Sequence, residues 1–210
     1  KGVATPEDAL QGAMDIIAED IADDADIRAW VRKFVADNGT IVTEAKDKEQ
    51  QSVYEMYYEY REPVRKIPPH RVLAINRGER EDVLKVAIEA DMERIEGYIA
   101  RKVVKGPSVV RELLEQTIAD ANKRLIFPSI EREVRAALSE KAEEQAIAVF
   151  AANLRNLLLQ PPVKGKTVLG VDPAYRTGCK LAVVDETGKL LEVDVVYPTP
   201  PHNKTAEAAK

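Results

Sequence analysis

Apolar residues recur at helical spacing through most of the first 160 residues. Leu10, Met14, Ile17 and Ile21 would share one face of a helix that Thr5-Pro6 begins, because threonine caps helices and proline fits the first helical position. The same spacing predicts further helices at about 26–36, 91–104, 108–125 and 129–159. The last of these would be roughly 45 Å long at 1.5 Å per residue.

Short apolar or alternating runs predict strands elsewhere in this part of the chain. Residues 39–43 form one such run, and 71–76 and 83–90 form two more on either side of a turn at 77–80. We expect 71–90 to be a two-stranded ribbon, which must pack on the helices because an isolated ribbon is marginally stable in water. Breaks at Gly106-Pro107-Ser108 and Phe127-Pro128-Ser129 are expected to separate the later helices.

The region 166–197 has a different pattern, with three short runs in series. Thr167–Val171 and Cys179–Val184 are apolar, and Leu190–Tyr197 alternates between apolar and acidic residues. A Gly-containing turn at 185–188 predicts a hairpin. The Pro-rich segment 160–165 reads as a linker. The predicted fold is therefore mainly α with short β segments, in two domains covering residues 1–160 and 166–210.

The chain is acidic overall, whereas proteins that bind nucleic acid are usually basic. Charged residues make up 32% of the chain and the net charge is −5, so binding to nucleic acid would depend on local patches. The densest basic cluster consists of His70, Arg71, Arg77 and Arg80. Two interpretations remain open: an edge that binds phosphates, or ion pairs with the acidic residues at 79, 81 and 82.

Four of the seven tyrosines lie between residues 54 and 60. Beside Arg61, Arg65 and Lys66, these rings would suit stacking on unpaired bases. The interpretation we favour is that they pack on a helix face with their hydroxyls at its rim. Trp30 is expected in the core, because its neighbours at helical spacing are apolar.

Several classes of protein are not supported by the sequence. Cys179 is the only cysteine, so no disulfide framework exists and we expect a reducing, cytoplasmic environment. No apolar run is long enough to span a bilayer, so we expect no membrane association. There is no Gly-rich phosphate loop, CxxC pair, HExxH spacing or nucleophile–base motif.

Asp172 is the one candidate metal ligand. It follows an apolar strand, which would hold its carboxylate rigidly at the sheet margin, and Mg²⁺ prefers such oxygen ligands. The alternative is that Asp172 only opens an Asp-Pro turn. Considered by itself, Asp172 is better explained by the turn than by a metal site.

Three separated segments together carry a family resemblance. VLGVDPAYRTGCKLAVVDETGKLLEVDVVYPTPPHNKT (168–205) closely resembles the start of the YqgF-like domain in bacterial transcription accessory proteins of the Tex family. ALQGAMDIIAEDIADD (9–24) and PPHRVLAINRGE (68–79) also look like Tex sequence. The resemblance implies that residues 166–210 are the first three antiparallel strands of a ribonuclease H-like α/β domain. It also implies that Asp172 occupies a metal-ligand position of that fold, for which Mg²⁺ is a candidate ion; no cofactor is assigned.

The expected function is that of a nucleic-acid-binding transcription accessory protein that acts as a scaffold in RNA or transcription metabolism. RNA or DNA, and the transcription machinery, are the expected partners. The family implies a helix-hairpin-helix region and an RNA-binding barrel beyond this chain, so the nucleic-acid contacts assigned here are His70, Arg71, Arg77, Arg80 and Arg176.

Two classes of enzyme are the alternatives. A metal-dependent nuclease of the resolvase type needs several converging carboxylates, and only Asp172 matches a family position, so we do not expect this chain to cut nucleic acid by itself. A sugar-kinase or actin-like ATPase would have a turn rich in Gly, Ser and Thr after the aspartate. The bulkier, basic segment 173–178 argues against that class.

Overall fold

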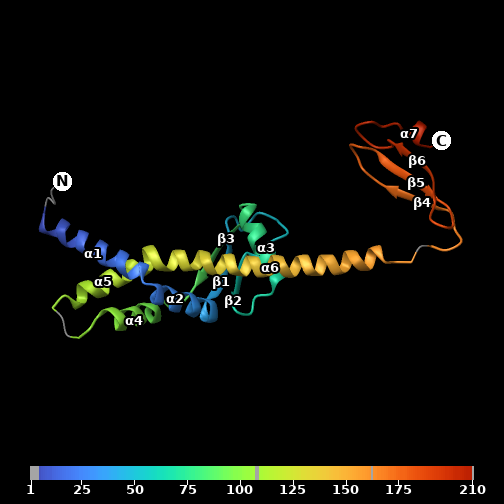
Figure 1. The fold of residues 1–210 in the computed structure, drawn as a ribbon. Helices are drawn as coiled ribbons and strands as arrows, with labels where there is room; N and C mark the ends of the chain where they lie inside the picture. The colour runs from blue at the N-terminus through green and yellow to red at the C-terminus, as the bar shows by residue number, and fades with distance from the viewer. Residues whose placement is uncertain (1–4, 107–108, 162, 210) are drawn as a thin grey trace. The chain divides into compact units, whose positions relative to one another are not determined.

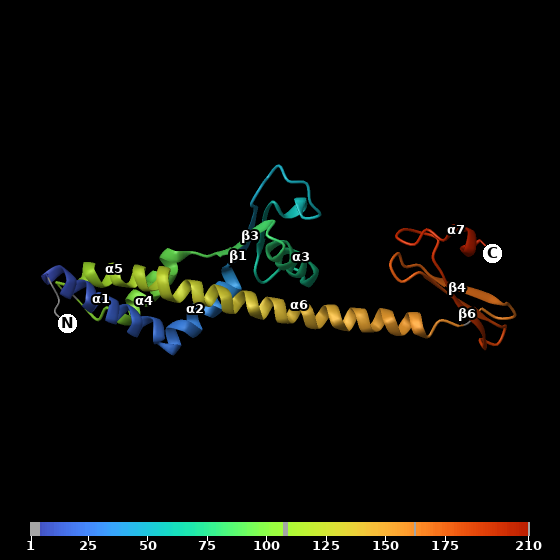
Figure 2. The ribbon, with the colours of Figure 1, turned by 90° about the horizontal axis from the view of Figure 1, so that it is seen from above.

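The computed structural model describes residues 5–106, 109–161 and 163–209. The backbone contacts divide the chain after Ala151 into two compact units, which are described separately below (Figures 1 and 2).

The first unit begins with two capped helices. Helix α1 (Pro6–Asp23) has Thr5 as its N-cap, and the Thr5 and Asp8 side chains bond each other's backbone N–H groups in a capping box. Helix α2 (Ala25–Asn38) begins directly afterwards, because Asp24 accepts hydrogen bonds from the N–H groups of Asp26 and Ile27. Both predicted helices are confirmed.

A small antiparallel sheet follows the two helices. Strands β1 (Thr40–Ala45), β2 (Glu59–Pro63) and β3 (Leu84–Glu89) lie in the order β2-β1-β3. The central strand β1 corresponds to the predicted strand 39–43. The sequence pattern does not predict strand β2. The tyrosine-rich segment that contains β2 has a local pattern that favours a helix.

The predicted two-stranded ribbon at 71–90 is wrong. Residues 71–76 belong to helix α3 (Pro69–Arg80), and only β3 matches the predicted second strand. The short apolar run in residues 71–76 suits a strand or a helix, and the decisive spacing is that of Val72, Ile75 and Gly78, which are all buried. Because Pro69 occupies the first turn, its missing N–H donor costs no helical hydrogen bond.

The rest of the first unit is helical. Helix α4 (Met92–Val103) matches the predicted helix 91–104, and α5 (Arg111–Ala121) lies beside α1 (Figures 1 and 2). The predicted break at Gly106-Pro107-Ser108 falls partly outside the described residues.

The predicted break at Phe127-Pro128-Ser129 is wrong. A π-helical turn (Asn122–Ile126) joins α5 to α6 (Phe127–Leu158) without interruption. The N–H of Phe127 bonds the carbonyl of Asn122, five residues back. We attribute the tolerance of Pro128 to this wider turn, which relieves the clash between a proline ring and the preceding helical carbonyls.

One buried core joins these elements. Its largest fully buried side chains come from α2, α3, β3, α4, α5 and α6, and include Val31, Ile75, Leu84, Ile99, Ile118 and Ile130. Trp30 packs at the edge of this core, stacked on Tyr98 with ring centroids 3.8 Å apart. Helix α6 is part of the core as far as Ala142, and its later apolar residues, such as Phe150, are exposed.

The second unit contains the three predicted strands. Strands β4 (Val168–Asp172), β5 (Cys179–Val184) and β6 (Leu190–Val196) form an antiparallel sheet in that order, followed by the short helix α7 (Thr205–Ala208). The predicted fold class, a mainly helical region followed by three antiparallel strands, is confirmed. Part of the predicted linker 160–165 lies outside the described residues.

Candidate nucleic-acid interface

Helix α3 presents basic residues on the side opposite to the core. Val72, Ile75 and Gly78 face inward, so the helical repeat turns His70 and Arg77 outward, and both are exposed. Arg80 is also exposed, at the C-terminal end of the helix. Of the predicted contact residues, these three are therefore gathered on one exposed surface, which we call the α3 basic face.

Arg71 is held differently. Its Nη1 donates to the Tyr60 hydroxyl and to Glu62 Oε2, at 3.0 Å in each case, and its guanidinium lies over the Tyr60 ring. The hydrogen bond to Glu62 raises the pKa of Arg71. Burial, together with the hydrogen bond to Glu62, raises the pKa of Tyr60 to about 12. Arg71 therefore joins α3 to β2, and its charge is partly balanced.

Glu81 partly balances the charge of Arg77. Arg77 Nε donates to Glu81 Oε1 at 2.8 Å, and the Tyr54 hydroxyl donates to the other carboxylate oxygen at 2.8 Å. The bond from Arg77 lowers the pKa of Glu81. The side chains of Arg80 and His70 make no ion pair or hydrogen bond with any residue that the structure describes, although Arg80, after Arg77, contributes to lowering the pKa of Glu81. Arg80 is thus the least compensated cation of this surface.

The tyrosines next to this surface are not free to stack on bases. Tyr54 and Tyr57 have exposed fractions of only 4% and 6%. Tyr57 packs edge-on against Tyr60, with ring centroids 5.3 Å apart. The packing interpretation is therefore correct, although no α-helix is involved: Tyr57 lies in a 3-10 turn (Glu55–Tyr57) that Tyr54 and Tyr58 flank, and Tyr60 lies in β2.

Asp172 ends β4, as expected, and its nearest charged partner is a cation. Lys180 lies opposite it on β5, with Lys180 Nζ 3.8 Å from Asp172 Oδ2. Within the described parts of the chain, no group of three or more His, Cys, Asp or Glu side chains is placed to hold a metal ion. One exposed carboxylate beside an ammonium group does not by itself fit Mg²⁺, which prefers several oxygen ligands.

Arg176 lies in the loop between β4 and β5, where its side chain is exposed. Its backbone carbonyl is 3.2 Å from His202 Nε2, so the contact to His202 involves the backbone and leaves the guanidinium at the surface. Arg176 and the α3 basic face belong to different units.

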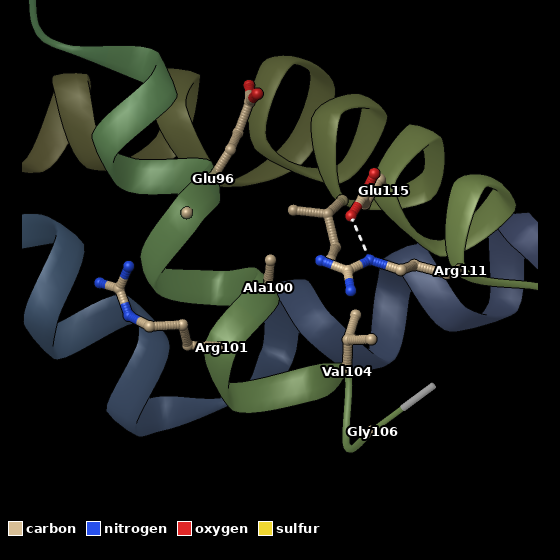
Figure 3. A pocket seen from close by; sticks show the side chains of 9 residues that line it. Glu96, Ala100, Arg101, Val104, Gly106, Arg111 and Glu115 are labelled. Carbon is tan, nitrogen blue, oxygen red and sulfur yellow. Dashed lines mark hydrogen bonds and ion pairs between the residues drawn. The ribbon is translucent and has the colours of Figure 1, made fainter. Parts of the chain in front are cut away.

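Two concave features depend on how helices pack against one another, which the sequence pattern does not predict. A cavity of about 710 Å³ lies between α4 and α5, where Arg111 Nε donates to Glu115 at 2.9 Å (Figure 3). Its walls mix charges of both signs, among them Glu96 and Arg101. A second, more apolar groove of about 430 Å³ lies against α6.

Comparison with known families accounts for nearly the whole chain. Residues 1–150 match the model described as Tex central region-like, and residues 166–210 match the Tex protein YqgF-like domain. The chain belongs to the Tex family. The resemblance seen in the sequence is thereby confirmed.

Similar proteins occur in bacteria and in animals. The chain is 59% identical over 212 residues to a protein from Bacillus subtilis named uncharacterized protein YdcI, covering 99% of this chain and 30% of that protein. It is 40% identical to the transcriptional accessory protein Tex of Neisseria gonorrhoeae, covering 90% of this chain and 26% of that protein. It is 33% identical to human S1 RNA-binding domain-containing protein 1, covering 94% and 21%. The chain thus spans less than a third of the length of each of these relatives.

None of the chain's described helices is long and apolar enough to cross a membrane.

Proposed function

We propose that this chain is the scaffold region of a cytoplasmic, nucleic-acid-binding transcription accessory protein. Membership of the Tex family supports this, as do relatives whose names refer to transcription and to RNA binding. Its expected ligand is RNA or DNA, recognised through the phosphate backbone, and its expected protein partner is the transcription machinery.

The observation that carries the proposal is the α3 basic face. The side chains of Arg80 and His70 form no ion pair with the described residues, and Arg77 is exposed although paired with Glu81. Arginine donors suit phosphate oxygens, and such contacts position a nucleic acid without reading its bases. Arg71 lies beside this face and contributes a partly balanced charge. Arg176 supplies a separate contact on the second unit.

The test is fluorescence anisotropy with a short single-stranded RNA and with duplex DNA, measured across a range of salt concentrations. Arg80→Glu is expected to weaken binding and to reduce the salt slope by about one, as expected for the loss of one phosphate contact. Lys123→Glu is the matched control, because Lys123 is also exposed and makes no ion pair with the described residues. Equal effects of the two variants would remove the α3 basic face from the proposal.

The described residues give no support to the alternative of a metal-dependent nuclease. Its chemistry requires converging carboxylates, whereas Asp172 is accompanied by Lys180. A role for Asp172 in metal binding remains a proposal about the longer protein.

A further inference from the structure

An apolar groove runs along one stripe of α6, within the first unit. On the α6 side it is lined by Val134, Ala137, Leu138, Lys141 and Gln145, which recur at helical spacing. Helix α2, the segment before α3 and the first turn of α3 form the other side. We call this feature the α6 groove; its volume is about 430 Å³.

The floor of the α6 groove is aliphatic. Val64, Ile67 and Val72 contribute side chains that are at most 8% exposed, and Val134 is 5% exposed. Ala137, at the rim, is exposed and small, so that another backbone can approach α6 closely there. None of the described residues that line the groove is aromatic.

The rim of the groove is positively charged, although the whole chain carries −5. Its ionisable lining residues are Arg32, Arg65, Lys141 and Glu133, which gives 3 − 1 = +2. The Glu133 carboxylate is not available to balance further cations, because it pairs with Arg32 and with Arg28 at 2.6 Å each. Arg65 and Lys141 have no ion-pair partner in the described parts of the chain. Two uncompensated cations therefore border an aliphatic floor.

We propose that the α6 groove binds an acidic amphipathic helix of a partner protein. A helix places apolar side chains at i, i+3, i+4 and i+7 in such a groove, and its flanking Asp or Glu residues would meet Arg65 and Lys141. Charge complementarity selects this occupant and disfavours a basic one. The site is separate from the α3 basic face, and the inference does not depend on nucleic-acid binding.

Nucleic acid fits the groove less well. Single strands bind where bases stack on aromatic rings in a positively charged channel, and the floor here offers aliphatic side chains only. Phosphates would meet Arg65 and Lys141 but would leave the floor uncovered. An aliphatic floor with a basic rim matches a peptide that is both apolar and acidic.

The test is selection from a displayed random peptide library on the purified 210-residue chain, followed by anisotropy with the selected peptides in synthetic form. Ala137→Glu places a bulky negative charge in the groove, and Ala136→Glu is its matched control outside it. Both alanines are exposed, and each new glutamate would have one acidic and one basic neighbour four residues away on α6. Lys141→Glu and Arg132→Glu form a second matched pair of exposed positions without ion-pair partners among the described residues. Thermal unfolding by circular dichroism checks that all four variants fold.

The expected result is selection of sequences with apolar residues at helical spacing and flanking Asp or Glu. Their affinity should fall at least about tenfold, or roughly 1.4 kcal/mol, in Ala137→Glu and Lys141→Glu, and be unchanged in the controls. Failure to select any peptide, or selection of basic ones, would overturn the proposal. Binding of single-stranded RNA with the same dependence on Lys141 would also overturn it, because the groove would then be a nucleic-acid site. A dimer seen by light scattering that only Ala137→Glu dissociates would overturn it as well, because the groove would then bind a second copy of the chain.

Discussion

A Cβ atom placed on Gly78 would lie 2.6 Å from Leu84 Cδ1. Leu84 is fully buried on β3, so α3 packs against the sheet so closely that a side chain at this position would force a neighbouring group to shift. Gly78 lies on the same buried face of α3 as Val72 and Ile75. His70, Arg77 and Arg80 lie on the opposite, exposed face.

Gly78→Ala should destabilise the first unit, by about 1–3 kcal/mol, because overpacking forces neighbouring side chains or backbone to move. Gly12→Ala is the matched control: Gly12 lies in α1, and no atom lies within 4 Å of the position that an added methyl group would take. There the substitution should stabilise by about 0.5–1 kcal/mol through helix propensity alone. Chemical denaturation followed by circular dichroism measures both. A stable Gly78→Ala variant would show that Leu84 can move aside.

Local signals in the sequence predict much of the fold correctly. Thr5-Pro6 marks the start of α1 correctly, and the apolar runs after residue 166 mark three real strands. These elements depend on caps, turns and periodicity within a few residues. The long helix α6 is also predictable, because its pattern extends over many turns.

The errors arise where distant contacts decide the structure. The segment 71–76 has apolar residues that suit a strand or a helix, and packing of Gly78 on Leu84 favours the helix. Pro128 normally ends a helix, but here it follows a π-helical turn that the local sequence does not predict. The α6 groove and the pairing of Arg71 with Glu62 likewise require elements that the sequence alone does not bring together.

Asp24 should contribute to the acid sensitivity of the first unit. A hydrogen bond from Lys102, followed by one from the Ile27 N–H, lowers its pKa below 3.8. The stabilisation from ionised Asp24 is therefore complete above about pH 3.8 and is lost as the pH falls through the lower folded-state pKa.

Asp24→Asn should reduce this acid-dependent part of the stability while keeping the cap of α2, since asparagine caps helices as well as aspartate does. Asp24→Ala should cost about 1 kcal/mol more through loss of the cap. Urea unfolding at pH 7 and at pH 3 checks both variants. Asp23→Asn, at the adjacent residue, is the control for removing one negative charge, and an identical pH profile for Asp23→Asn and Asp24→Asn would contradict the assignment.

Binding of nucleic acid by this chain should be weak and steeply dependent on salt. The net charge of −5 opposes association, so affinity must come from local phosphate contacts, which weaken as counterions compete. Among charge reversals, Arg80→Glu should have a larger effect than Arg77→Glu, because Glu81 already compensates Arg77. Anisotropy titrations at low and high salt test this order, and tight binding at high salt would refute it.

Asp172 should bind divalent cations only weakly in this chain. A single carboxylate replaces few of the water ligands of Mg²⁺, and the Lys180 ammonium 3.8 Å away adds electrostatic repulsion. Calorimetry with Mg²⁺ or Mn²⁺ should therefore give nearly the same small heats for the wild type and for Asp172→Ala. Lys180→Ala should strengthen binding slightly, because it removes the competing cation, and Asp194→Ala tests whether the acidic residue on β6 takes part. Micromolar binding that disappears in Asp172→Ala would show that further ligands reach this position, and the nuclease alternative would then be favoured over the scaffold.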